Sequence, residues 1–354
     1  MSTSHESFAV AAAVLTCLLV SPPASAQELR IGDPVFADEP FVRPATALNN
    51  STSVASISGG FLVHSGINSE AARFADDGTS LDAAPFEVPE HQHLSCIDTT
   101  CLLVDRRGRG QRITVDGTLL DATPFPIQID GISAWMVRRL GTRWVVVGHS
   151  GRTDELPWVM VDTHGVVLEA TRRAIPVDTS GDRYVGLECD AMGCLHSYTV
   201  TDDTGAVELW VRRLSPTGAI LGAPSLISAD SRLGRARAFA HVAMGDVHAV
   251  FFEDSDNVEH AVRVRRDGTV LDITPIEVGR VAHRGTFRAA CFESGCLLPI
   301  EVFNPLGPQE IHTRVFSSTG TLSPAQPLLI PEADHEQLRM GCNPSVCMAV
   351  WHEG

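Results

Sequence analysis

The stretch LSCIDTTCLLVDRRGRGQRITVDGTLLDATPFPI, residues 94–127, decides the fold of this 354-residue chain. It holds an apolar hairpin with a cysteine on each strand, then a strand–turn–strand around Asp116-Gly117, then a closing segment, PFPI. Asp-Gly between alternating strands is a strong hairpin signal, because both central positions of a type I′ turn need a positive φ. The stretch therefore predicts a unit of four antiparallel strands.

The cysteine hairpin recurs along the chain. Four copies carry cysteines at positions i and i+5: Cys96 and Cys101, Cys189 and Cys194, Cys291 and Cys296, Cys342 and Cys347. Three more copies keep the apolar strand–turn–strand pattern without cysteines, around Phe61, Trp144 and His248. The second strands of these seven hairpins begin 40 to 54 residues apart. Units of four strands at periods of about 40–50 residues are typical of β-propeller blades.

The glycine turn and the closing proline also recur. Six turns carry a glycine, namely Gly78, Gly117, Gly165, Gly218, Gly268 and Gly320, and most are followed by a Pro-containing strand. No segment shows a helical 3.6-residue period of useful length. We predict an all-β fold, a β-propeller of seven blades, each a four-stranded antiparallel sheet. A solenoid of the same units is the alternative, although it would need polar caps at both ends.

The two ends of the sequence predict how the propeller closes. The last unit stops at Gly354, after its second strand, and so supplies half a blade. Near the other end, Gly32-Asp33-Pro34-Val35 matches the closing segment of the other units. A strand over residues 29–36 that joins the half-blade at residues 340–351 would cover an exposed sheet edge. We therefore predict closure by N-terminal strand pairing.

Residues 1–26 have the pattern of a secretory signal peptide. An apolar run from Phe8 to Val20 precedes Ala24-Ser25-Ala26, a small-x-small cleavage site between Ala26 and Gln27. The run is too short for a membrane span of about 20 residues. Cys17 raises the alternative of a lipoprotein anchor, which Thr16 before it disfavours. We predict an exported protein, secreted, periplasmic or at the cell surface, with one propeller domain at 27–354.

The eight cysteines after the leader predict four disulfides within hairpins. Cross-strand positions i and i+5 around a four-residue turn bring two Cα atoms within the separation that a disulfide needs. An even number of cysteines also fits an oxidising compartment. The alternative, zinc, needs a second cysteine pair to converge on the first, whereas blades would hold these hairpins apart.

The charge of the chain excludes several function classes. All 27 basic residues are Arg, 43 residues are acidic, and the formal net charge is −16. Without Lys there is no Schiff-base lysine and no phosphate-binding loop ending in Gly-Lys-Ser/Thr. Nucleic acid is also disfavoured as a partner, because phosphate binding depends on clustered cations.

The repeated units resemble the propeller-like repeats of secreted proteins from myxobacteria and related bacteria. The resemblance lies in the Cys-paired hairpin, the Asp-Gly turn and the Pro-Ile closing strand, and it covers nearly all of the chain after the leader. Three glycine turns lack the Asp and three inner hairpins lack the cysteines. Because such proteins are mostly uncharacterised, the resemblance implies the architecture and no activity.

No catalytic motif is complete in the sequence. Gly148-His149-Ser150-Gly151 resembles a nucleophile elbow, but Arg152 stands where the pattern needs Gly. The acidic loop with Asp254 and Asp256 offers oxygen ligands to Ca²⁺, although it lacks the twelve-residue ligand pattern. We expect no other cofactor, and we interpret this loop as a solvated hairpin loop.

The predicted function is an exported binding or scaffold module, a monomer that binds an unknown protein or carbohydrate. The alternative is a hydrolase or lyase that acts on extracellular carbohydrate or a lactone at the propeller channel, with carboxylates from several blades. Sequence cannot detect such carboxylates, because they lie far apart in the chain, and fold does not imply function.

Overall fold

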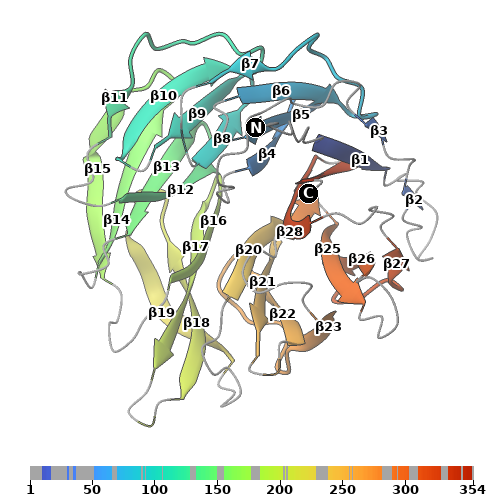
Figure 1. The fold of residues 1–354 in the computed structure, drawn as a ribbon. Helices are drawn as coiled ribbons and strands as arrows, with labels where there is room; N and C mark the ends of the chain where they lie inside the picture. Colours follow the sequence, from blue (N-terminus) through green and yellow to red (C-terminus); the bar gives the residue numbers. More distant parts are fainter. Residues whose placement is uncertain are drawn as a thin grey trace, which may run out of the picture. The chain divides into compact units, whose positions relative to one another are not determined.

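A computed structural model describes 10–16, 30–31, 35–36, 52–65, 70–88, 91, 93–105, 107–127, 133–149, 155–176, 184–201, 204, 206–228, 238–254, 256, 258–280, 289–292, 294–302, 310–327, 334–343 and 346–352. All regular structure in these residues is β-strand (Figure 1). The chain divides into two compact units, one formed by residues 1–88, 280–317 and 321–354, the other by 89–279 and 318–320.

The second unit contains four antiparallel sheets, each with its strands in chain order. The first two sheets consist of β8 (His93–Ile97), β9 (Thr100–Val104), β10 (Arg109–Thr114) and β11 (Phe125–Pro126), then β12 (Ser133–Leu140), β13 (Arg143–His149), β14 (Glu155–Asp162) and β15 (Val167–Pro176). The next two consist of β16 (Tyr184–Asp190), β17 (Gly193–Thr201), β18 (Val207–Leu214) and β19 (Ile220–Ser228), then β20 (Ala238–Met244), β21 (Val247–Glu253), β22 (Val258–Arg265) and β23 (Ile276–Arg280). The first strands of successive sheets pack side by side, as in the blades of a propeller.

The first unit contains two sheets of the same kind and a third that differs. The regular sheets are β4 (Thr52–Ile57), β5 (Gly60–Ser65), β6 (Glu70–Ala75) and β7 (Phe86–Glu87), and β24 (Ala290–Phe292), β25 (Gly295–Val302), β26 (Glu310–Ser317) and β27 (Gln326–Pro327). The third sheet has the order β2 (Arg30–Ile31), β1 (Val10–Thr16), β29 (Val346–His352) and β28 (Asp334–Cys342), and β3 (Val35–Phe36) also pairs with β1. Within this unit β28 packs against both β4 and β24.

The predicted fold class, an all-β β-propeller, is confirmed, but the predicted number of regular blades is wrong. The described residues form six four-stranded blades rather than seven. The C-terminal sheet departs from the form because β1, from the expected leader, pairs along its whole length with β29, from Val10↔His352 to Thr16↔Val346. Seven paired residues outcompete the two-residue strands β2 and β3, since each further pair adds ladder hydrogen bonds.

The predicted N-terminal closure needs the same correction. Residues 30–31 and 35–36 do join the sheet of β28 and β29, as expected. They do so on the far side of β1, through the pairs Leu15↔Ile31 and Ala12↔Val35, and not by pairing with β29. The segment that was expected to close the blade is therefore one strand farther out than predicted.

The core of each blade comes from the inner hairpin strands and the strand after them. Trp144 and Val146 of β13 are fully buried and lie in one cluster with Leu102 and Val104 of β9. The Trp144 indole Nε1 donates to the Ser95 carbonyl at 3.0 Å, so its one polar atom is satisfied. Both faces of β13 carry apolar residues, because its sheet packs against a neighbouring sheet on either side within the second unit.

The glycine turns form where predicted, but their geometry is not type I′. In the turn after β10, Gly117 N donates to Thr114 O and Thr114 N donates to Thr118 O, at 2.9 Å each. The loop therefore has three residues, and only its glycine has a positive φ, 87°. This pattern is a type I turn followed by a left-handed glycine, which explains why the residue before Gly can vary between units.

Candidate functional site

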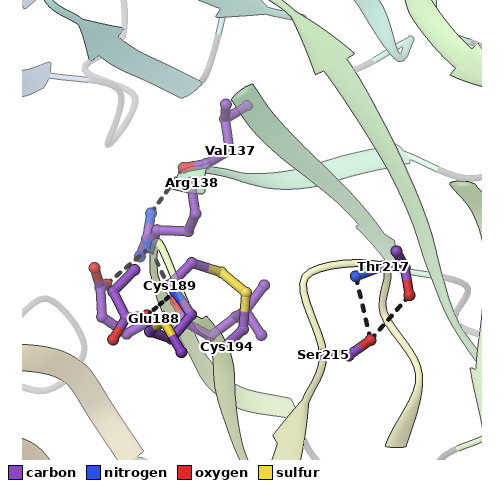
Figure 2. Close-up of a disulfide and its surroundings, with 10 residues drawn as sticks. Val137, Arg138, Glu188, Cys189, Cys194, Ser215 and Thr217 are labelled. Carbon is purple, nitrogen blue, oxygen red and sulfur yellow. Dashed lines mark hydrogen bonds and ion pairs between the residues drawn. A yellow bond between two sulfur atoms is a disulfide. The ribbon is translucent and has the colours of Figure 1, made fainter. Parts of the chain in front are cut away.

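The predicted cysteine pairs all lie at disulfide distance within their hairpins. The S–S distances are 2.06, 2.01, 1.96 and 1.91 Å for the pairs that begin at Cys96, Cys189, Cys291 and Cys342. Figure 2 shows the pair Cys189 and Cys194, which joins β16 to β17 beside Arg138 of β12. The Arg138 Nε donates to the Leu187 carbonyl at 2.9 Å, so this hairpin is also tied to the preceding blade.

Of two other predicted sites, one lies outside the described residues and the other can be examined. The cleavage site at Ala26 and Gln27, and Cys17, lie outside the described residues. In the acidic loop, Asp254 Oδ1 accepts from the backbone N–H groups of Asp256 and Val258, and Asp254 Oδ2 lies 3.0 Å from His260 Nε2. Both oxygens of Asp254 thus serve the loop itself, and no group of three metal-binding side chains is found among the described residues.

One serine–histidine contact bears on the alternative that the protein is an enzyme, because such a pair can act as nucleophile and base. Ser197 Oγ lies 3.1 Å from His241 Nδ1 and donates to the Gly186 carbonyl at 3.3 Å. Ser197 is fully buried, and burial lowers the pKa of His241 well below its usual value, aided by the positive charge that His248 would carry. A substrate cannot reach this hydroxyl, so the contact is structural.

The structure reveals a repeated arginine–aspartate clamp. In three blades the third strand carries an Arg, and the Asp four residues after the turn glycine accepts from both its backbone N–H and its guanidinium. In the β20–β23 sheet, Asp272 Oδ2 lies 2.8 Å from Arg263 N, and Asp272 Oδ1 lies 2.6 Å from Arg263 Nη2. The other clamps are Arg112 with Asp121 and Arg73 with Asp82. Such paired charge-assisted bonds are the strong kind.

The clamped arginine also seats a glycine turn. Arg112 Nη1 donates to the Thr163 carbonyl at 2.8 Å, in the turn that follows β14. A Cβ atom at Gly165 of that turn would lie only 2.8 Å from Arg112 Nε. Arg263 makes the same contact with the Ser318 carbonyl, at 3.0 Å. The turn glycine is therefore required both by its positive φ and by the arginine packed on it.

One blade has the arginine without its aspartate. Arg213 of β18 pairs with Leu195, and this is the register in which Arg112 pairs with Leu102 in the β8–β11 sheet. The fourth residue after the turn glycine, which is Asp in the clamps, is Gly222 in this blade. The Arg213 side chain still lies on the next glycine turn, 3.2 Å from the place of a Cβ at Gly268. Among the described residues it forms no hydrogen bond and no ion pair. The blade therefore holds the Arg213 guanidinium in the clamp register without a carboxylate to pair with it.

A second departure from the repeat lies in the next sheet. His248 of β21 occupies the position that is Cys101, Cys194 or Cys296 in other blades, and its cross-strand partner is Ala243. The imidazole is 1% exposed, and neither ring nitrogen has a hydrogen-bond partner among the described residues. An unsatisfied buried polar group normally costs about 1–3 kcal/mol, so its persistence calls for an explanation.

The two departures line one pocket between the β16–β19 and β20–β23 sheets. Its volume is about 210 Å³, and its lining residues are Asp190, Met192, Gly193, Cys194, Leu195, Arg213, Leu214, His248, Arg266 and Asp267. Leu195 and Leu214 are buried and make the wall apolar. Met192, 67% exposed, lines the pocket from the turn between β16 and β17. Small-molecule sites commonly combine an apolar wall with a few convergent polar groups.

The charges of the pocket are mostly paired, with one exception. Arg266 forms ion pairs with Asp190, Nε to Oδ2 at 2.5 Å, and with Asp246, Nη1 to Oδ1 at 3.3 Å. Desolvation by burial lowers the pKa of His248 to about 4, an effect that Asp190 opposes and Arg266 reinforces. At neutral pH the pocket therefore offers a neutral imidazole and the guanidinium of Arg213, with Asp267 exposed at the rim.

Sequence reasoning missed this site, although two signals for it were present. An alignment of the units on their turn glycines shows Asp at the fourth following position in three units and Gly222 in this one. An alignment on the hairpins shows a polar His248 in a slot that otherwise holds cysteine or an aromatic residue.

Comparison with known proteins supports the fold and gives no family. The sequence matches no protein-family model and none of the curated proteins. The structure of apo AztD from Citrobacter koseri is similar over 98% of this chain and 99% of that one, with a TM-score of 0.51 and 9% identity. At that identity the likeness concerns the fold alone. No helix in the described part of the chain has the length and hydropathy of a membrane span.

Two more solved structures give lower scores. One is Prp20p from Saccharomyces cerevisiae, whose structure is described together with its binding properties to Gsp1p and histones. The match covers 98% of this chain and 92% of that one, with 10% identity and a TM-score of 0.49. BamB from Moraxella catarrhalis covers 86% with 97% of its own, at 9% identity and a TM-score of 0.44. Both TM-scores are below 0.5.

Proposed function

We propose that the protein is an exported binding module, and that its ligand binds in the pocket between the β16–β19 and β20–β23 sheets. The observation that supports this most strongly is His248, a buried imidazole in the wall of the pocket whose two nitrogens have no hydrogen-bond partner in the part of the chain that the structure describes. A ligand with a donor or acceptor at this depth would satisfy the imidazole and offset its desolvation.

The rest of the blade favours binding over structural use of these residues. Where the fold needs an arginine for stability, as at Arg112 and Arg263, it supplies an aspartate to hold it. Arg213 has the same position and no aspartate, so the same rigid backbone presents it to a ligand. Groups held by strands are better preorganised for binding than groups on loops.

A fragment screen tests this proposal. Ligand-observed NMR on the purified protein would use neutral, cationic and anionic fragments of up to about ten non-hydrogen atoms. We expect a set of fragments whose signals are lost with His248→Trp, which fills the pocket, and kept with His164→Trp, since the His164 side chain is 85% exposed and lies outside the pocket. If no fragment depends on position 248 while both variants keep the wild-type melting temperature, the proposal is wrong.

The export of the protein is a separate part of the proposal. It is supported by the signal-like pattern of residues 1–26, by four cysteine pairs at disulfide distance and by the resemblance to secreted propeller-like repeats. N-terminal sequencing of the protein recovered outside the cytoplasm should start at Gln27. Recovery of an intact Met1 terminus in the cytoplasm, with free thiols, would contradict it.

A further inference from the structure

The pocket lacks one specific partner, and the intact clamps show its chemistry. In the clamps of Arg112 and Arg263, both oxygens of one carboxylate engage the arginine, one at 2.6 Å from Nη2 and the other at 3.0 Å from Nε. Arg213 lies in the same register, on the same kind of strand, with Gly222 in place of the aspartate. At the position where two other blades hold a carboxylate beside the arginine, this blade has glycine and no carboxylate.

We propose, resting on the proposed function, that the pocket binds a small organic monocarboxylate, with the Arg213 guanidinium holding its carboxylate and Leu195 and Leu214 contacting its apolar chain. Arginine and carboxylate form bidentate pairs, and no described side chain forms a hydrogen bond or an ion pair with this guanidinium. His248, at the buried end of the pocket, supplies a neutral donor and acceptor for a polar atom farther along the ligand.

The charge balance of the pocket selects a monoanion. Arg266 is already paired with Asp190 and Asp246, so it adds no net positive charge. Asp267 lies at the rim, and its pKa is lowered first by the side-chain hydrogen bond with Thr269 and in smaller part by the charges of Arg265 and Arg213, which keeps it ionised. A dianion such as phosphate would face two carboxylates and only one uncommitted cation.

The volume and the walls select a short apolar body. A volume of about 210 Å³ suits a small molecule rather than a sugar chain or a folded segment. The buried leucines and Met192 present carbon and sulfur rather than hydrogen-bonding groups. A carboxylate on a chain of a few carbons satisfies the guanidinium and the apolar wall together.

Butanoate is the probe, and butanamide is its neutral match. We expect titration calorimetry or NMR to show butanoate binding at least tenfold more tightly than butanamide, with inorganic phosphate weaker than butanoate. Arg213→Gln should reduce the affinity for butanoate to that for butanamide. Arg265→Gln, at an exposed arginine outside the pocket, should leave it unchanged.

A second pair of variants keeps the arginine. Gly222→Asp should supply the missing carboxylate and lower butanoate affinity at least tenfold, whereas Gly222→Asn, with the same backbone demand, should retain it. Equal affinity for acid and amide, tighter binding of phosphate, or an equal loss with Asp and Asn would overturn this inference. If neutral fragments still depend on position 248 in those cases, the pocket remains a binding site and only the ligand class is wrong.

Discussion

The β20–β23 and β16–β19 sheets carry the same arginine in two different states. Arg263 is held by Asp272 through its backbone N–H and its guanidinium, and its third contact is the carbonyl of Ser318. Arg213 has the same register and lies on the same kind of turn, but Gly222 leaves its guanidinium open. One fold position therefore serves stability in one blade and, in our proposal, ligand binding in the other, and the residue on the neighbouring strand, Asp272 or Gly222, distinguishes the two.

The largest effect should follow from breaking an intact clamp. Asp272→Ala leaves Arg263, whose side chain is 16% exposed, without its carboxylate. Removing one partner of a largely buried ion pair costs about 3 kcal/mol or somewhat more, because the remaining charge is uncompensated. We expect that loss in the free energy of unfolding, measured from urea transitions at pH 7.

The matched control for this clamp is Asp267→Ala. Asp267 lies in the preceding turn, is exposed, and accepts a hydrogen bond from Thr269 N of the same turn at 2.9 Å. Its removal should change the free energy of unfolding by less than about 0.5 kcal/mol, as surface substitutions usually do. Equal losses for the two variants would show that the clamp adds nothing beyond the turn itself.

The pocket should respond to acid through His248. Because its folded pKa, about 4, is below the usual value of 6.5, the unfolded chain takes up the proton first. His248 therefore causes no acid-dependent loss of stability above pH 6.5, and the fold loses stability as the pH falls from 6.5 toward 4. By linkage this amounts to about 2.5 kcal/mol between pH 7 and pH 4.5.

A variant that cannot titrate isolates this term. His248→Gln should lose about 2.5 kcal/mol less than the wild type when the urea transition is moved from pH 7 to pH 4.5. His164→Gln, at an exposed position, should follow the wild type. The clamps provide the contrast. Desolvation raises the pKa of Asp121, but its bonds with Arg112 lower that pKa overall. Protonation of Asp121 therefore costs stability only below about pH 4, a lower pH than the range in which His248 acts. If His248→Gln and the wild type lose equal stability, burial of the imidazole has been misjudged.

The sequence was sufficient for the features that local chemistry decides. The cysteine spacing placed Cys96 opposite Cys101, and the turn glycines marked the outer hairpins, because in both cases the residues concerned are neighbours in the chain. The type I′ prediction failed because Asp-Gly also fits a three-residue loop with the glycine last. Only the backbone hydrogen bonds distinguish the two.

Features that need contacts between distant segments were not predictable in this way. An apolar run such as residues 10–16 has the pattern of a leader and of a buried strand, so its pairing with β29 could not be read from periodicity. The pocket required Arg213 and His248 from two sheets to face one wall. Each residue was visible as a departure from the repeat, but its neighbour across the sheet boundary was not.

The smallest effect, and the sharpest for the comparison, comes from converting one state into the other. Gly222→Asp restores the clamp sequence to the β16–β19 sheet, and a Cβ at Gly222 meets no atom within 4 Å. Gly222 has a φ of 73°, a conformation that Asp and Asn tolerate better than other residues, so both variants carry a similar backbone cost. The difference between them is the charge offered to Arg213. We expect Gly222→Asp to be more stable than Gly222→Asn by about 1 kcal/mol at pH 7, from urea transitions, since a new partly exposed arginine–carboxylate pair adds little more than that. The double variant Gly222→Asp with Arg213→Gln should abolish the gain. If it remains in the double variant, the carboxylate acts on the turn and not on the arginine, and the two sheets do not share one clamp position.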